Sequence, residues 1–254
     1  MTAQVGQRLV AAGLAAFLAF ISIPKAGSQQ VVDLELVLAI DTSGSVDPWE
    51  FNLQILGLAE AFRDPEVQAA IAGSTPNGIA VAVVQWSGPT EQALATPWML
   101  VSDRLSAELL ATGIEVMGRQ FMGRTGIAGA LAYALRMLTN NGFVGHRRVI
   151  DLSGDGRSND PHDPAAVRDA AVAAGITVNG LAILTDVPDL DSFYRAHVVG
   201  GPDAFLMIAK DYQDFVHAIR RKLLREIRGT PIGAMPLPDA RPQTLGRRLP
   251  AASR

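Results

Sequence analysis

The chain has 254 residues, of which 48% are hydrophobic and 19% are charged, and it contains no cysteine. With a mean hydropathy of +0.20 it is too apolar to be largely disordered, and it is long enough for one globular domain with a full core. The formal net charge is −3, but residues 29–228 carry −8, because residues 1–28 contribute +2 and residues 229–254 contribute +3. This acidic body argues against nucleic-acid binding, and the lack of cysteine excludes a disulfide framework.

Residues 1–28 have the pattern of an export signal. Arg8 supplies the positive start, residues 9–23 form an apolar run, and residues 26–28 are small enough for cleavage. The run is shorter than the roughly 20 residues that cross a bilayer. We expect cleavage and export to the periplasm or the medium, with no stable membrane span afterwards; an uncleaved anchor is the alternative.

The first half of the body begins with a buried strand at residues 31–40. It runs into the polar stretch Asp41-Thr42-Ser43-Gly44-Ser45. Asp47 and Glu50 then form a capping-box pattern, which predicts an amphipathic helix ending near Asp64. After it we expect a short helix (65–72), a buried strand (79–86), an edge strand containing Pro97 (92–101), a helix from Ser102 or Asp103, and a glycine-rich loop (121–126).

The second half continues the alternation of helices and strands. A helix from Ile127 to Leu138 precedes a strand at residues 147–152 and a polar loop at 153–160. Further helices are expected at 164–174 and 190–197, with strands at 176–184 and 204–208, and Asp211 begins a final amphipathic helix. This order predicts an α/β fold of three layers: a doubly wound, mainly parallel sheet with helices on both faces.

Three loops at the expected carboxyl edge of this sheet carry oxygen donors. Asp41, Ser43 and Ser45 alternate along an extended loop, so their side chains can converge on one ion. Thr125 precedes a helix, and Asp155 follows a buried strand. Oxygen-only ligation favours Mg²⁺, Mn²⁺ or Ca²⁺ over zinc or copper. Two aspartates only neutralise a divalent ion, so an open side of the ion would attract a carboxylate from outside.

These motifs resemble the von Willebrand factor type A (VWA) domain, a Rossmann-like family with a metal-ion-dependent adhesion site (MIDAS). The resemblance rests on Asp-x-Ser-x-Ser after the first strand, a threonine before a later helix, and Asp-Gly after the next buried strand, and it spans about residues 31–228. It implies that Asp41, Ser43, Ser45, Thr125 and Asp155 are metal ligands, and that an Asp or Glu of a protein partner completes the shell. The stretch Ile-Asp-Leu-Ser-Gly-Asp-Gly (150–156) resembles a bacterial exported subgroup of unknown function.

One detail departs from the family pattern. Most relatives have Thr-Asp-Gly or Ser-Asp-Gly after the fourth strand, whereas this chain reads Ser153-Gly154-Asp155-Gly156. It also places Asp151 inside the strand, where relatives are mostly apolar. Asp151 is therefore the alternative to Asp155 as the third ligand, or a residue that supports the site through a hydrogen bond.

The expected organisation is a signal peptide (1–28), a VWA domain (29–228) and a flexible Pro/Arg-rich tail (229–254). The expected function is divalent-metal-dependent binding of a protein partner. Two alternatives remain: a metal-dependent hydrolase that uses the same ion, and a metal-free structural scaffold. The sequence contains none of the common nucleophile-elbow, P-loop, zinc-protease or dinucleotide motifs, so a non-enzymatic role is expected.

Overall fold

The computed structural model describes residues 29–139 and 141–229. The expected signal and the expected tail, apart from Gly229, lie outside these residues. The described chain forms, in order, β1 (Gln30–Asp41), α1 (Pro48–Arg63), α2 (Pro65–Ser74), β2 (Ile79–Trp86), β3 (Gln92–Val101), α3 (Arg104–Glu115), α4 (Ile127–Met137), β4 (Phe143–Gly154), α5 (Pro164–Ala173), β5 (Thr177–Ile183), α6 (Leu190–His197), β6 (Leu206–Ala209) and α7 (Tyr212–Arg228).

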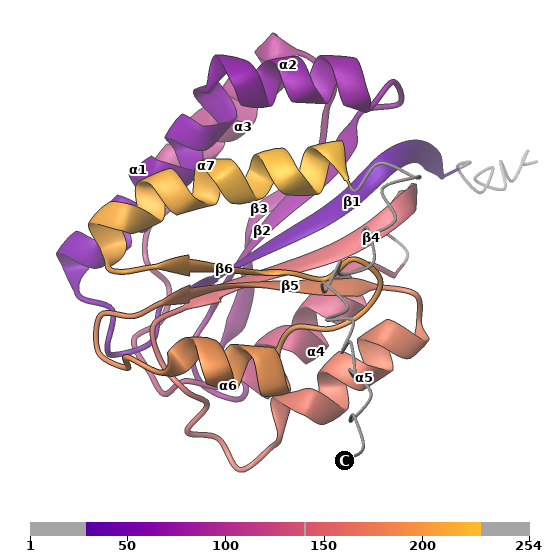
Figure 1. The fold of residues 1–254 in the computed structure, drawn as a ribbon. Coiled ribbons are helices and arrows are strands. Elements are labelled where there is room, and N and C mark those ends of the chain that lie inside the picture. The colour runs from indigo at the N-terminus through magenta and orange to yellow at the C-terminus, as the bar shows by residue number, and fades with distance from the viewer. Residues whose placement is uncertain (1–28, 140, 230–254) are drawn as a thin grey trace, which may run out of the picture.

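The strands form one six-stranded sheet in the order β3-β2-β1-β4-β5-β6 (Figure 1). All neighbouring pairs are parallel except β2 and β3, which are antiparallel. Helices α1, α2, α3 and α7 cover one face, and α4, α5 and α6 cover the other (Figure 1). This confirms the three-layer, mainly parallel α/β fold, and it places the carboxyl ends of β1, β2 and β4 side by side.

Local sequence signals account for the first helix. Asp47 accepts hydrogen bonds from the backbone N–H groups of Trp49 and Glu50, and the Glu50 side chain accepts one from the Asp47 N–H. This capping box and the proline at the first helical position fix the start of α1. The apolar side chains of α1, spaced at three and four residues, are buried against the sheet, as predicted: Phe51, Ile55, Leu58 and Phe62.

Several element boundaries and side-chain exposures differ from the sequence prediction, and the following differ most. Strand β4 begins at Phe143, four residues early, because residues 143–145 pair with the start of β1. Strand β6 lies at Leu206–Ala209 instead of 204–208. On α3, Leu105 and Leu109 are 68% and 56% exposed, whereas Leu110 is fully buried.

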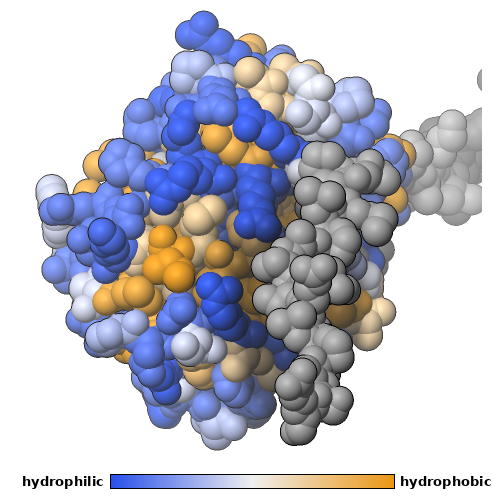
Figure 2. Space-filling model, in the orientation of Figure 1, coloured by the Kyte–Doolittle hydropathy of each residue, from blue (hydrophilic) through white to orange (hydrophobic). Residues whose placement is uncertain are grey.

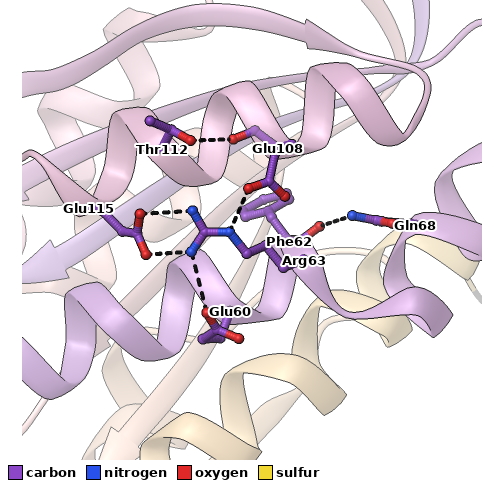
Figure 3. Close-up of polar contacts among 7 residues, drawn as sticks. All are labelled: Glu60, Phe62, Arg63, Gln68, Glu108, Thr112 and Glu115. Carbon is purple, nitrogen blue, oxygen red and sulfur yellow. Dashed lines mark hydrogen bonds and ion pairs between the residues drawn. The ribbon is translucent and has the colours of Figure 1, made fainter.

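Helices α1 and α3 are joined at the surface by Arg63 (Figure 3). Its Nε donates to Glu108 Oε1 at 2.8 Å, its Nη2 donates to Glu115 Oε2 at 2.8 Å, and its Nη1 contacts both Glu115 and Glu60. The Arg63 guanidinium therefore forms ion pairs with three carboxylates from two helices.

The outer surface of α7 is mostly polar, and apolar residues gather over β6 between α7 and α6 (Figure 2). Ile208 is 36% exposed there. No helix among the described residues has the length and apolarity to cross a membrane.

Candidate metal centre

The end of β1 folds into a tight polar loop. Asp41 is fully buried, Ser43 is 1% exposed, and Ser45 is exposed. The Ser43 N–H donates to Asp41 Oδ1 at 2.7 Å, and the hydroxyls of Ser43 and Ser45 lie 3.2 Å apart. The alternating residues of this loop thus have their oxygens close together, as their spacing predicts.

Asp155, one residue beyond β4, lies against this loop. The Ser45 hydroxyl donates to Asp155 Oδ1 at 2.7 Å, although the two residues are 110 positions apart. The other carboxylate oxygen accepts a hydrogen bond of 3.0 Å from Tyr212 Oη at the start of α7. Asp155 is fully buried. Each of its two carboxylate oxygens accepts a hydrogen bond from a side chain of another part of the fold.

Thr125 approaches the site from the third loop. Its side chain is buried, and its Oγ1 lies 3.7 Å from the point that a Cβ on Gly156 would occupy. Asn159 holds the Thr125 backbone on both sides: its Oδ1 accepts from the Thr125 N–H at 2.9 Å, and its N–H donates to the Thr125 carbonyl at 3.0 Å. The Gly44 N–H donates to the Gly123 carbonyl at 2.9 Å, which joins this loop to the β1 loop.

Arg119 supports the β1 loop, and the sequence analysis missed it. Its Nη2 donates to the carbonyls of Thr42 at 3.0 Å and Ser43 at 2.7 Å, and its guanidinium lies 5.9 Å from the centroid of the Phe51 ring. Arg119 lies in an irregular segment with no periodic pattern, so no sequence signal marks it. Asn159 and Tyr212 were also missed as contacts of the site.

Gly154 provides room for Asp41. A Cβ at this position would lie 2.7 Å from Asp41 Oδ2, 2.8 Å from Tyr194 Oη and 3.2 Å from the Trp86 ring. Asp41 Oδ2 and Tyr194 Oη are both buried, and neither has a hydrogen-bond partner among the described residues. A buried carboxylate oxygen without a partner is an acceptor still available to a ligand.

Burial and charge repulsion dominate the electrostatics of this cluster. Burial, and next the charge of Asp155, raise the pKa of Asp41 to about 7. Burial also raises the pKa of Asp155, against the opposing effect of its hydrogen bonds from Ser45 and Tyr212. Both carboxyl groups therefore resist ionisation. A nearby cation would stabilise their ionised forms.

Asp151 does not join the cluster. Its carboxylate lies 2.5 Å from Lys222 Nζ on α7, inside the layer between the sheet and that helix. Residue 151 still lies within β4, under the middle of α7, whereas Asp155 lies beyond the end of the strand, where the loops meet. Of the two aspartates that the sequence left open, only Asp155 contacts the serine loop.

The residues present fit a hard divalent cation. The donors are carboxylate and hydroxyl oxygens, and one of the carboxylate oxygens is buried without a partner. Within residues 29–139 and 141–229 no group of three or more His, Cys, Asp or Glu side chains converges, so this site depends on two carboxylates together with hydroxyl oxygens. The ligand assignment for Asp41, Ser43, Ser45, Thr125 and Asp155 stays a prediction.

A family model described as "Protein of unknown function (DUF1194)" matches residues 31–231. The match covers most of the chain. The chain therefore belongs to the DUF1194 family. No curated protein matches the chain in sequence.

Solved structures share the fold of this DUF1194 chain. One is proximal thread matrix protein 1 from the mussel byssus, crystal form 2, at 17% identity and a TM-score of 0.57, covering 79% of this chain and 49% of that one. Another is the same mussel protein with a zinc-occupied MIDAS motif, at 13% identity and a TM-score of 0.55, covering 76% and 45%. A third is a von Willebrand factor type A protein from Catenulispora acidiphila, at 20% identity and a TM-score of 0.54, covering 77% and 43%.

These likenesses confirm the VWA fold that the motifs suggested. The DUF1194 chain spans less than half the length of the matched chain in each of these three structures. At such low identity they are evidence of fold and not of a shared partner.

Proposed function

We propose that this protein is an exported VWA-domain protein that binds another protein through a divalent cation. Asp41, Ser43, Ser45, Thr125 and Asp155 hold the ion, which is Mg²⁺, or alternatively Mn²⁺ or Ca²⁺. The observation that carries the proposal is the contact of Ser45 Oγ with Asp155 Oδ1 at 2.7 Å, next to the buried Asp41. Oxygen donors from loops far apart in the sequence meet there. The mussel protein with zinc in its MIDAS motif supports divalent binding in this fold.

The open side of the site determines what the ion does. Ser45 is exposed, whereas Asp41 and Asp155 are fully buried. Two buried aspartates neutralise a divalent ion without leaving excess negative charge, and the hydroxyls add none. The ion then attracts an Asp or Glu carboxylate of the partner from the solvent side.

Exposed apolar side chains near these loops favour a protein as the partner. Trp49, in the first turn of α1, is 64% exposed, and Met122, next to the glycine that accepts from Gly44, is 69% exposed. Aromatic and methionine side chains are enriched at protein interfaces. They provide an apolar border around a charged central contact.

The test is a pull-down from the native extract with the full chain as bait, in Mg²⁺ and in EDTA. The Ser43→Ala/Ser45→Ala variant is compared with Ser74→Ala/Ser102→Ala, which changes two serines at the opposite edge of the sheet. We expect capture in Mg²⁺ only, by the wild type and the control variant. Capture that survives EDTA would favour the metal-free scaffold. Hydrolysis of a phosphoester panel, lost in Asp41→Ala, would instead favour the metal-dependent hydrolase.

A further inference from the structure

A second cluster of charged side chains lies buried between β4 and α7, away from the candidate metal centre. Lys222 is fully buried, and Asp151 and Glu226 are each 2% exposed. Lys222 Nζ lies 2.5 Å from Asp151 Oδ1 and 2.7 Å from Glu226 Oε1. Asn179 Nδ2 also donates to Glu226 Oε1, at 3.1 Å. One amine is therefore held against two carboxyl groups in the core of the protein.

The charges and hydrogen-bonding atoms of this cluster are not fully matched by partners. It holds two carboxyl groups for one ammonium, and neither oxygen of Asp151 has a hydrogen bond of ordinary geometry among the described residues, although Lys222 Nζ lies close to one of them. Burial, and next the charge of Glu226, raise the pKa of Asp151 to about 7. A buried ion pair is stabilising only when its remaining polar atoms are bonded.

We propose that Lys222 and Asp151 join in an intramolecular amide bond. Proton transfer within the pair gives a neutral amine and a neutral carboxylic acid. Nζ of Lys222 then attacks Cγ of Asp151, a C–N bond forms, and one C–O bond breaks. Glu226 takes a proton from the attacking nitrogen and passes it to the departing hydroxyl, which leaves as water. The sum is one amide and one water, and no oxidant, reductant or cofactor is consumed.

The surroundings favour this condensation. Amide formation is opposed by bulk water, and all three side chains are almost fully excluded from it. The fold holds nucleophile and acid in contact, which replaces a bimolecular encounter by an intramolecular one. Glu226 and Asn179 also line a cleft of about 720 Å³, which gives the released water a route to solvent.

The bond would tie the last helix to the central sheet. Lys222 lies in α7 and Asp151 in β4, 71 positions earlier in the chain. Since the chain has no cysteine, a disulfide cannot provide such a tie. The amide would keep α7 attached to the sheet when heat or denaturant weakens the non-covalent packing between them. It would thereby also keep Tyr212 close to Asp155.

Tryptic digestion and mass spectrometry of the purified full chain test the proposal directly. Trypsin cleaves after Arg148, Arg157, Arg221 and Arg225, and an acylated Lys222 resists cleavage. We expect residues 149–157 covalently joined to residues 222–225, lighter than the two peptides together by one water molecule. Recovery of residues 149–157 only as a free peptide would overturn the proposal. Residues 222–225 joined instead to the peptide that carries Asn179, with loss of one ammonia, would also overturn it, because the acyl group would then come from the Asn179 amide.

Two variants separate chemistry from packing. Glu226→Gln keeps the volume of the side chain but cannot carry the proton, so we expect the joined peptide to be lost. Glu115→Gln changes a surface glutamate of α3 as the matched control, and the joined peptide should persist. Full joining in Glu226→Gln would overturn the role of Glu226. The digest of the wild type decides the bond itself, whether or not the variants fold.

Discussion

Gly154 separates Ser153 from Asp155, and its lack of a side chain leaves the space that Asp41 occupies. The sequence showed this glycine as an unexplained extra residue between the serine and the aspartate. Only the three-dimensional contact with Asp41 and Tyr194 gives its reason. A residue from another strand sets this constraint, so no local pattern in the sequence could reveal it.

Gly154→Ala is predicted to destabilise the protein by about 1–3 kcal/mol, the usual cost of overpacking a core. The new methyl group would lie 2.7 Å from Asp41 Oδ2, so metal affinity should fall as well. Gly73→Ala is the control, because a Cβ there meets nothing within 4 Å and alanine favours the helix by up to about 1 kcal/mol. Urea unfolding measures both, and equal stability of the two variants would contradict the packing argument.

Tyr212→Phe is predicted to cost about 1–3 kcal/mol, because Asp155 Oδ2 loses its donor while remaining buried. The control is Tyr133→Phe, at a half-buried tyrosine on α4, where we expect a change within about 0.5 kcal/mol. Thermal unfolding of both variants checks the difference. A stable Tyr212→Phe would mean that water replaces the hydroxyl without cost.

At the scale of elements, the sequence predicted those helix and strand boundaries that local residue patterns determine. Proline, capping aspartates and three-to-four spacing marked α1, and α6 and β2 begin and end where expected. Pairing partners decided the rest: β4 extends to Phe143 only because β1 lies beside it. The burial of Lys222 and Glu226 on α7 was also beyond the sequence, since charged residues on a helix are normally taken as its solvated face.

The Arg63 cluster between α1 and α3 is a test of surface ion pairs. Arg63→Met is predicted to lower stability by about 1 kcal/mol, because a guanidinium that serves three carboxylates is better organised than an isolated pair. Arg104→Met, an exposed residue in the first turn of α3, is the control. Chemical unfolding at low and high salt should show the Arg63 effect shrinking with salt.

The same cluster predicts a pH dependence with a definite sign. The hydrogen bond from Arg63 holds the pKa of Glu115 below its ordinary value of 4.5. Because the pKa of Glu115 is lower in the folded chain than in the unfolded chain, the ion pair contributes its full stability at pH values above the unfolded pKa. This contribution is lost as the pH falls through the folded pKa. The gap between wild type and Arg63→Met should therefore be larger at neutral pH than in acid. A gap that widens in acid would contradict this assignment.

At the scale of the molecule, the candidate site exists only in the folded chain. The Asp-x-Ser-x-Ser motif was visible in sequence, and so were Thr125 and Asp155 as oxygen donors at the same sheet edge. Their meeting depends on β1 and β4 lying side by side. Which of Asp151 and Asp155 contacts the serine loop depends on side-chain directions, which the sequence left open.

A cation bound across these loops should stabilise the whole domain. At a free Mg²⁺ concentration of 100 times Kd, the expected gain is about 2.7 kcal/mol, or roughly 5–10 °C in Tm at about 2–4 °C per kcal/mol. Thermal unfolding in Mg²⁺ and in EDTA measures it. Ser43→Ala/Ser45→Ala should show little shift, and an identical Tm for the wild type in both buffers would rule out a stabilising ion.

The antiparallel edge strand β3 has a consequence for self-association. Its pairing with β2 shifts register twice, near Thr96, and Pro97 has no N–H to offer a further strand. At the other edge, β6 is only four residues long. Neither edge of the sheet is therefore a good template for pairing with a strand of another chain. A ligand that arrives as an extended peptide must then be recognised at the loops, and not by β-augmentation.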